Sequence, residues 1–471
     1  MRKLTALALA ASVFTAPCMA ADATPDGAVN YDHIAKMSRA IWDYAEVGYK
    51  EAKSSKLLQD ALKKAGFKVE AGVADIPTAF EATYGSGGPV IAILAEFDAL
   101  PGISQDASPE RHILEEKKAG HACGHNLFGA GSVEAAISVA KWLKATGTPG
   151  TIRLYGTPAE EGGSGKVYMV RAGLFNDVDF VLHWHAGDRN MTSASSNLAN
   201  KSAKFRFHGL SAHAAAAPEK GRSALDGIEA MNMMVNMMRE HVPEESRIHY
   251  VITRGGSAPN VVPDFAEVYY YVRNPDAEVV KDIFDRVVAA ANGAAMGTGT
   301  TVDYEIVGGT HALLINETLA QVADEKMREV GGVTYDAEEQ AFAKTLYATL
   351  KGADISLDSA REVLPYGTTR SSGSTDVGDV SMTVPTVGIR TATWVPGTPA
   401  HSWQAIAASG MSIGYKGATV AAKTLAKVAA ELYTNPELRE KAKAEFEKQR
   451  GEDFKYEALL GDRPPALNYR D

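Results

Sequence analysis

The sequence predicts an α/β protein in which a mixed sheet carries helices on both faces and a second, ferredoxin-like domain is inserted between its two halves. Three observations predict this fold class. Strand-like apolar runs alternate with helix-like stretches from Val29 to Leu182. The order strand, helix, strand, strand, helix, strand then occupies residues 201–308. Helix and strand patterns like those of the first part of the chain resume at Thr318 and at Val384–Ile389.

Composition and charge are those of a globular enzyme or binding protein with more than one domain. The 471-residue chain has 48 Lys+Arg and 58 Asp+Glu, a net charge of −10. This acidic balance removes the electrostatic reason to expect a nucleic-acid partner. No run approaches the ~20 apolar residues that span a bilayer, so we expect no membrane anchor.

Residues 1–20 predict a cleavable secretory signal. Arg2-Lys3 precedes the apolar stretch Leu4–Phe14, and Cys18-Met19-Ala20 supplies small residues for cleavage. A buried N-terminal helix is the alternative, and lipid attachment at Cys18 is disfavoured by the proline before it. We expect the mature chain to be periplasmic or secreted. Cys123 is then its single cysteine, so it forms no internal disulfide and needs protection by burial or a metal.

The α/β domain is expected to comprise residues 21–200 and 309–440. Helical spacing of apolar residues extends from Val29 to Gly66. The next predicted elements are strands at Ala79–Tyr84 and Val90–Ala95, a helix at Leu127–Leu143, and strands at Thr151–Gly156 and Val178–Leu182. A long helix is expected at Ala405–Leu432, and residues 441–471 are assigned to a C-terminal tail on the surface.

Residues 201–308 are predicted to form the inserted domain. The elements are strands at Ser202–His208, Arg247–Thr253, Glu267–Arg273 and Thr301–Val307, and helices at Ala224–His241 and Glu278–Ala291. The first helix carries a methionine stripe that indicates core or a subunit interface rather than a cofactor site. The stripe consists of Met231, Met233, Met234, Met237 and Met238.

A cysteine and two histidines are concentrated in His121-Ala122-Cys123-Gly124-His125. A thiolate and an imidazole two residues apart, with glycine between them, are able to face one ion from a tight turn. Sulfur and imidazole nitrogen suit zinc, manganese or a similar divalent metal. A buried cysteine near two structural histidines is the alternative.

Paired acids follow the predicted strand Thr151–Gly156. Glu160 and Glu161 stand at the strand end, where open α/β sheets bind ligands. Adjacent carboxylates point differently, so one is able to bind a metal while the other takes a proton during metal-assisted hydrolysis. An exposed acidic turn is the alternative.

Histidines at two further positions complete the set of possible ligands. His183 and His185 close an apolar strand, and His401 precedes the last long helix. Isolated histidines are usually structural, but together these motifs offer more ligands than one four-coordinate ion needs. We therefore expect two metal ions.

Four segments resemble the metal-dependent amidohydrolases related to aminoacylases and glutamate carboxypeptidases. They are Ala95–Gly102, His121–Asn126, Pro158–Glu161 and Pro399–Ser402. The resemblance is greatest to the aminobenzoyl-glutamate hydrolase branch, which includes dipeptidases acting on Xaa-Lys or Xaa-Arg. It extends from about Val29 to Leu432, the inserted domain included.

The resemblance implies a di-metal catalytic domain. Cys123 resembles a thiolate that bridges two divalent ions, Mn2+ or Zn2+, and Glu160 resembles the general base. The other implied ligands are His125, Glu161, His185 and His401. Asp98 resembles an acid that orients ligands, and Glu96 stands where more distant relatives have a metal-binding histidine. His185 is preferred to His183 because Trp-His followed by small residues and Gly-Asp is similar to this branch.

The resemblance also implies that the inserted domain is a lid. His213, in Gly209–Ala215, resembles a histidine that polarises the scissile carbonyl, often from the neighbouring subunit. Asn260 and Arg273 resemble contacts to a substrate carboxylate or an oxyanion, a role for which a guanidinium is well suited. Gly373–Asp379 is typical of the branch and suits a loop that faces substrate.

These features predict an exported, metal-dependent amidohydrolase that cleaves the amide bond of an N-acyl amino acid such as aminobenzoyl-glutamate. A dipeptidase of the same fold, acting on Xaa-Lys, Xaa-Arg or other dipeptides, is the alternative. A periplasmic solute-binding protein is the alternative of a different class, but it has no use for Cys123, Glu160 and Glu161 together. Besides a small-molecule substrate, the expected partner is a second subunit, either identical and paired through residues 201–308, or related in a heterodimer.

Overall fold

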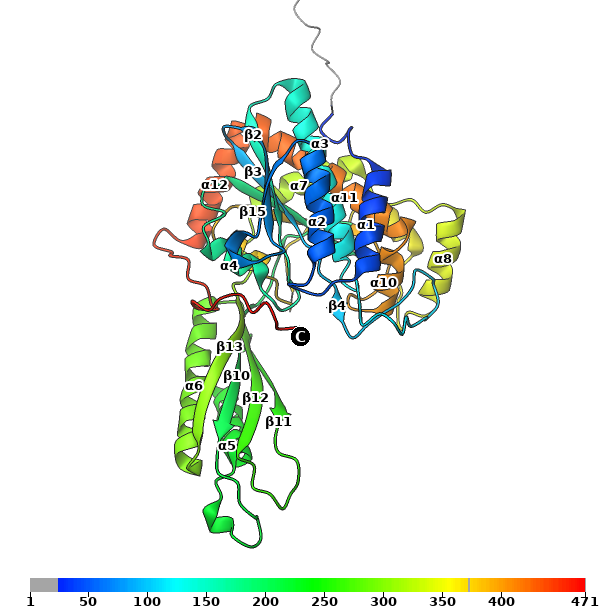
Figure 1. The fold of residues 1–471 in the computed structure, drawn as a ribbon. Coiled ribbons are helices and arrows are strands. Elements are labelled where there is room, and N and C mark those ends of the chain that lie inside the picture. The colour runs from blue at the N-terminus through cyan, green and yellow to red at the C-terminus, as the bar shows by residue number, and fades with distance from the viewer. Residues whose placement is uncertain (1–23, 372, 471) are drawn as a thin grey trace, which may run out of the picture.

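The computed structural model describes residues 24–371 and 373–470, so the signal expected at residues 1–20 lies outside the described residues. A seven-stranded sheet, in the order β1-β2-β6-β3-β7-β15-β8, forms the centre of the α/β domain (Figure 1). Strands β6, β3, β7 and β15 are parallel to one another, and the outer strands β1, β2 and β8 pair antiparallel. This mixed sheet confirms the predicted fold class. In the described ranges, no helix is long and apolar enough to cross a membrane.

The elements of this domain alternate along the chain as predicted. The strands are β1 Lys68–Ala71, β2 Phe80–Ser86, β3 Val90–Ala95, β4 Leu100–Pro101, β5 Ala119–Gly120, β6 Gly150–Gly156, β7 Phe180–Gly187, β8 Met191–Thr192, β9 Ser195–Ser196, β14 Thr369–Arg370 and β15 Thr386–Ala392. The helices are α1 Tyr31–Tyr44, α2 Ala52–Lys64, α3 His125–Thr146, α4 Gly165–Arg171, α7 Glu317–Val330, α8 Ala337–Tyr347, α9 Val377–Ser381, α10 Trp403–Ser409, α11 Ser412–Thr434 and α12 Pro436–Arg450, with short 3-10 turns at η1 Val73–Asp75 and η4 Leu357–Arg361.

Successive side chains of β7 point to opposite faces of the sheet. Trp184 is fully buried and its indole donates to the carbonyl of Phe128 on α3, so it faces the layer that α3 and α11 form. Because side chains alternate along a strand, His183 and His185 project to the other face. Helices α4 and α9 pack against each other there, and Val377 of α9 and His183 line the same cavity.

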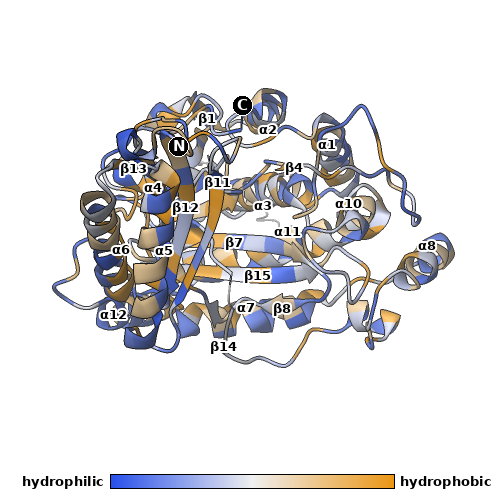
Figure 2. Cartoon of the chain, turned by 90° about the horizontal axis from the view of Figure 1, so that it is seen from below, coloured by the Kyte–Doolittle hydropathy of each residue, from blue (hydrophilic) through white to orange (hydrophobic). Residues whose placement is uncertain are grey.

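The inserted domain has the ferredoxin-like order predicted for it. Its elements are β10 Ala199–His208, α5 Ala224–Met238, β11 Arg247–Arg254, β12 Phe265–Asn274, α6 Ala277–Thr298 and β13 Thr301–Thr310, with 3-10 turns at η2 Pro218–Lys220 and η3 Arg239–His241. The antiparallel sheet has the order β11-β12-β10-β13, and α5 and α6 pack side by side against it (Figure 2). The buried faces form a second core, separate from that of the α/β domain.

The helix expected at Ala405–Leu432 is instead two helices, α10 and α11, separated at Gly410. Trp42 packs at this break: its indole donates to the carbonyl of Ile406, and its ring fills the space beside Gly410. A Cβ at Gly410 would lie 2.7 Å from this ring.

The C-terminal segment also differs from the expected surface tail. Helix α12 runs through the boundary placed at residue 440, because Asn435 caps its first turn and Pro436 suits that position. Beyond the helix, Leu459 belongs to the core of the inserted domain and Leu460 to that of the α/β domain. The segment therefore ties the two domains together where they meet, as Figure 1 shows in red.

Candidate metal centre and active site

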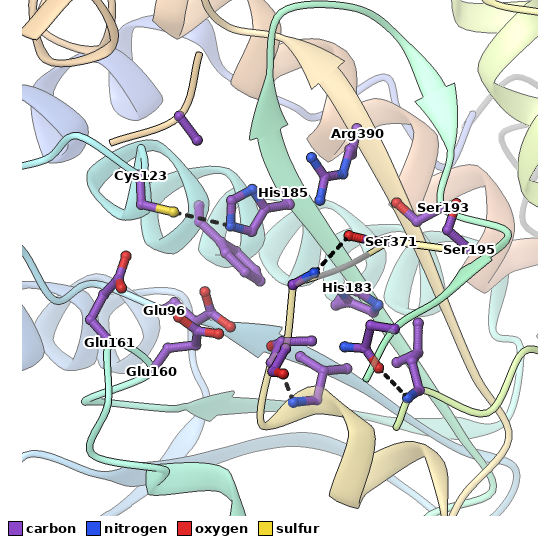
Figure 3. Close-up of a pocket in the computed structure, with 18 of the residues that line it drawn as sticks. Glu96, Cys123, Glu160, Glu161, His183, His185, Ser193, Ser195, Ser371 and Arg390 are labelled. Carbon is purple, nitrogen blue, oxygen red and sulfur yellow. Dashed lines mark hydrogen bonds between the residues drawn. The ribbon is translucent and has the colours of Figure 1, made fainter. Parts of the chain in front are cut away.

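The candidate ligands lie at the carboxyl ends of the parallel strands. Glu96 follows β3, Glu160 and Glu161 follow β6, and His185 lies near the end of β7. They line one cavity of about 500 Å³ together with Cys123 (Figure 3). This edge is where open α/β sheets bind ligands.

The turn before α3 brings Cys123 and His125 to this edge. Gly124 between them has a φ of 77°, and a Cβ there would lie 2.4 Å from the Cβ of Ala186 on β7. Glycine therefore permits both the left-handed backbone and the close approach. As a result, Sγ of Cys123 lies 3.5 Å from Nε2 of His185.

The described residues form three groups of potential ligands, of which two share Cys123 and the third comprises Glu96, His125 and Glu160. One comprises Cys123, His125 and His185, and the other comprises Cys123, Glu161 and His401. Within each group the ligand atoms lie within 4.8 Å of one another. Zinc–ligand bonds of about 2.0–2.3 Å allow one ion to reach all members of a group. The arrangement therefore fits two ions with the thiolate between them.

Several buried polar atoms at this centre have no hydrogen-bond partner among the described residues. They include Nε2 of His125, Oε1 of Glu161 and Oε2 of Glu96. Oε1 of Glu161 lies 3.3 Å from Nε2 of His401, and Oε2 of Glu96 lies 3.1 Å from Nε2 of His125. Buried polar atoms are rarely left unpaired, and a cation between these donor atoms would satisfy them. The residues present therefore fit a metal centre.

Asp98 holds two of the potential ligands in place. Its Oδ1 lies 2.9 Å from Nδ1 of His125, and its Oδ2 accepts a hydrogen bond of 2.9 Å from the backbone N–H of Glu161. The first contact leaves Nε2 of His125 to face the centre. The backbone N–H of His401 donates to the carbonyl of Ala122, which fixes the His401 loop against the cysteine turn.

The electrostatics of the centre favour a bound cation. The neighbouring side chains of Cys123 and Glu161 stabilise positive charge on the ring of His401 and raise its pKa to about 10. Burial lowers the pKa of His185 well below 6.5, and the nearby Arg390 charge lowers it further, which keeps this imidazole neutral and able to bind metal. Burial, followed by the charges of Glu96 and Glu161, raises the pKa of the Glu160 carboxyl well above its usual range.

Two histidines of the sequence motifs do not belong to any of these ligand groups. His183 is buried against Gly388 on β15, where a Cβ would lie 2.3 Å from its Nε2. His121 is buried as well, with Nε2 3.1 Å from the carbonyl oxygen of Ile41. The structure thus places His185, and not His183, beside Cys123.

The lid residues do not reach the cavity of their own chain. His213 and Asn260 lie together in the loops at the far end of the inserted domain, where the N–H of Ala214 donates to the carbonyl of Asn260. Arg273 lies near the opposite end of β12, which is about 30 Å long at 3.3 Å per residue. Within one chain, Asn260 and Arg273 are therefore too far apart to bind the same carboxylate.

The sequence patterns did not indicate two charged residues of this region, Lys166 and Arg390. Lys166 is fully buried, with Nζ 2.6 Å from Glu96 and 2.7 Å from Asp376. Arg390 lies at the cavity end of β15. The sequence offered one signal for Arg390, which is its position as the first charged residue after the apolar run Val384–Ile389. The Lys166–Asp376 contact joins residues 210 positions apart, which no local pattern reveals.

Comparison with known proteins identifies relatives over most of the chain. Residues 197–298 match the family model of a peptidase dimerisation domain. The chain is 41% identical to a subunit of the p-aminobenzoyl-glutamate hydrolase of Escherichia coli (strain K12), over 86% of this chain and 90% of that protein. It is 29% identical to a mouse Xaa-Arg dipeptidase, over 88% of this chain and 89% of that protein.

A solved structure shares the fold. It is a Bacillus subtilis protein described as a dinuclear metal-binding peptidase of the M20 family, which superposes with a TM-score of 0.58 at 18% identity, over 85% of this chain and 98% of that one. The two proteins thus share a fold.

Proposed function

Because the chain belongs to the M20 family of amidohydrolases and peptidases, together with the p-aminobenzoyl-glutamate hydrolase of Escherichia coli, we propose that it hydrolyses the amide bond of an N-acyl amino acid such as p-aminobenzoyl-glutamate with the help of two divalent ions. The observation that carries the proposal is the pair of ligand groups that share Cys123, with Glu160 lining the same cavity. A solute-binding protein has no need of this arrangement.

Residues of the two groups would hold the ions, which we propose to be Mn2+ or Zn2+. When bound, such ions polarise the amide carbonyl and lower the pKa of a water molecule. Glu160 takes the proton of the attacking water and delivers it to the nitrogen of the departing amine. The amide C–N bond is broken, and a carboxylic acid and a free amine leave the site.

His213 would supply a hydrogen bond to the oxyanion from a second subunit. Its Nδ1 accepts hydrogen bonds from the backbone N–H groups of Ala215 and Ala216, at 3.2 and 3.1 Å. The neutral ring therefore carries its proton on Nε2, where it is free to donate. Asn260 lies beside His213 and would enter the same site. We propose a homodimer, with a heterodimer of related subunits as the alternative, because the Escherichia coli relative is named as one subunit of its hydrolase.

The proposed location is the periplasm or the medium, because the sequence of residues 1–20 has the pattern of a cleavable signal. N-terminal sequencing of the protein recovered from cell fractions tests this directly. A protein that retains residues 1–20 and remains in the cytoplasm contradicts it.

The activity is tested by removing metal with a chelator, restoring Mn2+ or Zn2+, and assaying p-aminobenzoyl-glutamate beside Xaa-Arg and Xaa-Lys dipeptides. We expect release of p-aminobenzoate and glutamate, lost with chelator and recovered with metal. Cleavage of the basic dipeptides with no release of p-aminobenzoate would establish the dipeptidase alternative. Full activity in metal-free protein would refute the di-metal proposal.

A further inference from the structure

Arg390 is placed on the wall of the active-site cavity by the central sheet. It belongs to β15, an interior strand in which the other six residues are buried. Arg390 is exposed because it opens into the cavity. It stands directly opposite His185 in the parallel register of β15 and β7, strands about 4.8 Å apart. The guanidinium therefore lies beside the proposed metal centre.

The guanidinium of Arg390 has no counter-ion among the described residues. Among the described residues, Arg390 makes no hydrogen bond or ion pair, whereas the other cation of this region, Lys166, is fully committed to Glu96 and Asp376. An unpaired guanidinium on a cavity wall is a receptor for an anion that arrives with a ligand.

The residues around Arg390 support anion binding. Figure 3 shows Ser193, Ser195 and Ser371 on the same side of the cavity as Arg390, and Glu96, Glu160 and Glu161 on the other. Hydroxyl groups are able to donate to carboxylate oxygens that a guanidinium binds. The cavity thus has an acidic side, where the metal ligands lie, and a side with one cation and several hydroxyl donors.

We propose that Arg390, with the serine hydroxyls beside it, binds a carboxylate of the substrate and selects acidic N-acyl amino acids over basic dipeptides. This inference rests on the proposed function. An Xaa-Arg or Xaa-Lys substrate would bring its cation to an unpaired arginine, and like charges in a confined cavity repel. The carboxylate bound is either the α-carboxylate or the side-chain carboxylate of the amino acid released.

The test compares three substrates in wild type and in Arg390→Met. They are p-aminobenzoyl-glutamate, its side-chain amide p-aminobenzoyl-glutamine, and its α-amide p-aminobenzoyl-isoglutamine. With p-aminobenzoyl-glutamate we expect kcat/KM to fall about 10- to 100-fold, mainly through KM, as for loss of a hydrogen-bonded charge. On the amide that lacks the carboxylate bound by Arg390, the substitution should change little. If p-aminobenzoyl-glutamine is the unaffected substrate, Arg390 binds the side-chain carboxylate. If p-aminobenzoyl-isoglutamine is unaffected, Arg390 binds the α-carboxylate.

Two variants serve as controls. Arg390→Lys keeps the charge and should raise KM less than Arg390→Met does. Arg361→Met removes another exposed arginine, on η4, that does not line the cavity, and should behave as wild type. An equal loss on all three substrates, or none on any, would overturn the proposal.

Binding without turnover separates this inference from the proposed function. In the Glu160→Gln background, calorimetry measures the affinity for p-aminobenzoyl-glutamate with and without Arg390→Met. We expect binding to weaken about 10- to 100-fold in the double variant. Absence of hydrolysis by the wild type would refute the proposed function alone, whereas equal binding by the two proteins would refute the role of Arg390.

Discussion

Cys123 is the residue on which two of the ligand groups depend, since it is the one member they share. Replacing its sulfur with a serine hydroxyl removes a soft ligand from both ions at once. Loss of a residue that only supports a ligand typically lowers metal affinity ~10–100-fold, and we expect Cys123→Ser to lower it further. The variant should also lose nearly all turnover. Elemental analysis of the purified variant measures the occupancy. Full occupancy would contradict the bridging role.

Glu160 and Glu161 are neighbours with different surroundings, and this difference separates their expected roles. Glu161 belongs to a ligand group with Cys123 and His401, whereas Glu160 is grouped with Glu96 and His125, apart from Cys123. Glu160→Gln should therefore keep its metal and lose about 10²–10⁴-fold in kcat, because an amide carries no proton between water and amine. Glu161→Gln should weaken metal binding. Parallel metal analysis and kinetics check both, and equal metal loss in the two variants would remove the distinction.

At the scale of elements, a buried ion pair fixes α4 and the loop before α9 beneath the site. Lys166 contacts Glu96 and Asp376, and all three are almost fully buried. Removing the cation leaves two carboxylates without their partner, so we expect Lys166→Met to lower the free energy of unfolding by about 3–5 kcal/mol. Denaturant titration measures this change. The matched control is Lys141→Met, an exposed lysine on α3 that should shift the stability by less than about 0.5 kcal/mol. A similarly small change in Lys166→Met would show that the pair is not required.

Local patterns were sufficient for the element order but not for contacts made across the chain. Apolar spacing and the motifs placed the four parallel strands and the ferredoxin-like domain, because burial imposes those periods directly. Trp42, which packs against Gly410 where the two helices separate, lies far away in the sequence. The position of Arg390 beside His185 follows from the pairing of β15 with β7, which the sequence does not reveal. The sequence alone also did not show that Asn260 and Arg273 lie far apart in space, because both belong to one motif-rich domain.

On the scale of the whole molecule, the inserted domain holds its histidine away from its own metal centre. Figure 1 shows this domain extending from the α/β domain, with the loop that contains His213 at its far end. The C-terminal segment restrains it, since Arg463 donates to the carbonyls of Ile306 and Val307 on β13. Tyr469 OH and Arg470 meanwhile donate to the carbonyl of Glu161. A domain fixed in this way favours completion of the site by a second chain over closure within one.

The outer face of the inserted domain is suited to that second chain. On α5, Met233 and Met237 are 62% and 65% exposed, and Ile252 on the edge strand β11, which lines the same surface cavity, is 39% exposed. Met231 on the same helix is buried, so the methionine stripe divides between the core and this surface. An apolar helix face beside an unpaired strand edge is a surface that pairing would cover.

We therefore expect His213 of one chain to act in the metal centre of its partner. His213→Ala should keep its fold and its metal while losing about 10²–10³-fold in kcat, as for the loss of one oxyanion donor. Mixing it with Glu160→Gln tests the exchange. In a mixed dimer, the chain that retains Glu160 receives His213 from the other, so one of the two sites is intact. Random pairing of equal amounts should then restore about a quarter of wild-type activity, as two-fold symmetry dictates. Recovery is measured after subunit exchange has been verified with differently tagged chains. If exchange occurs and no activity returns, His213 acts within its own chain or only shapes the lid.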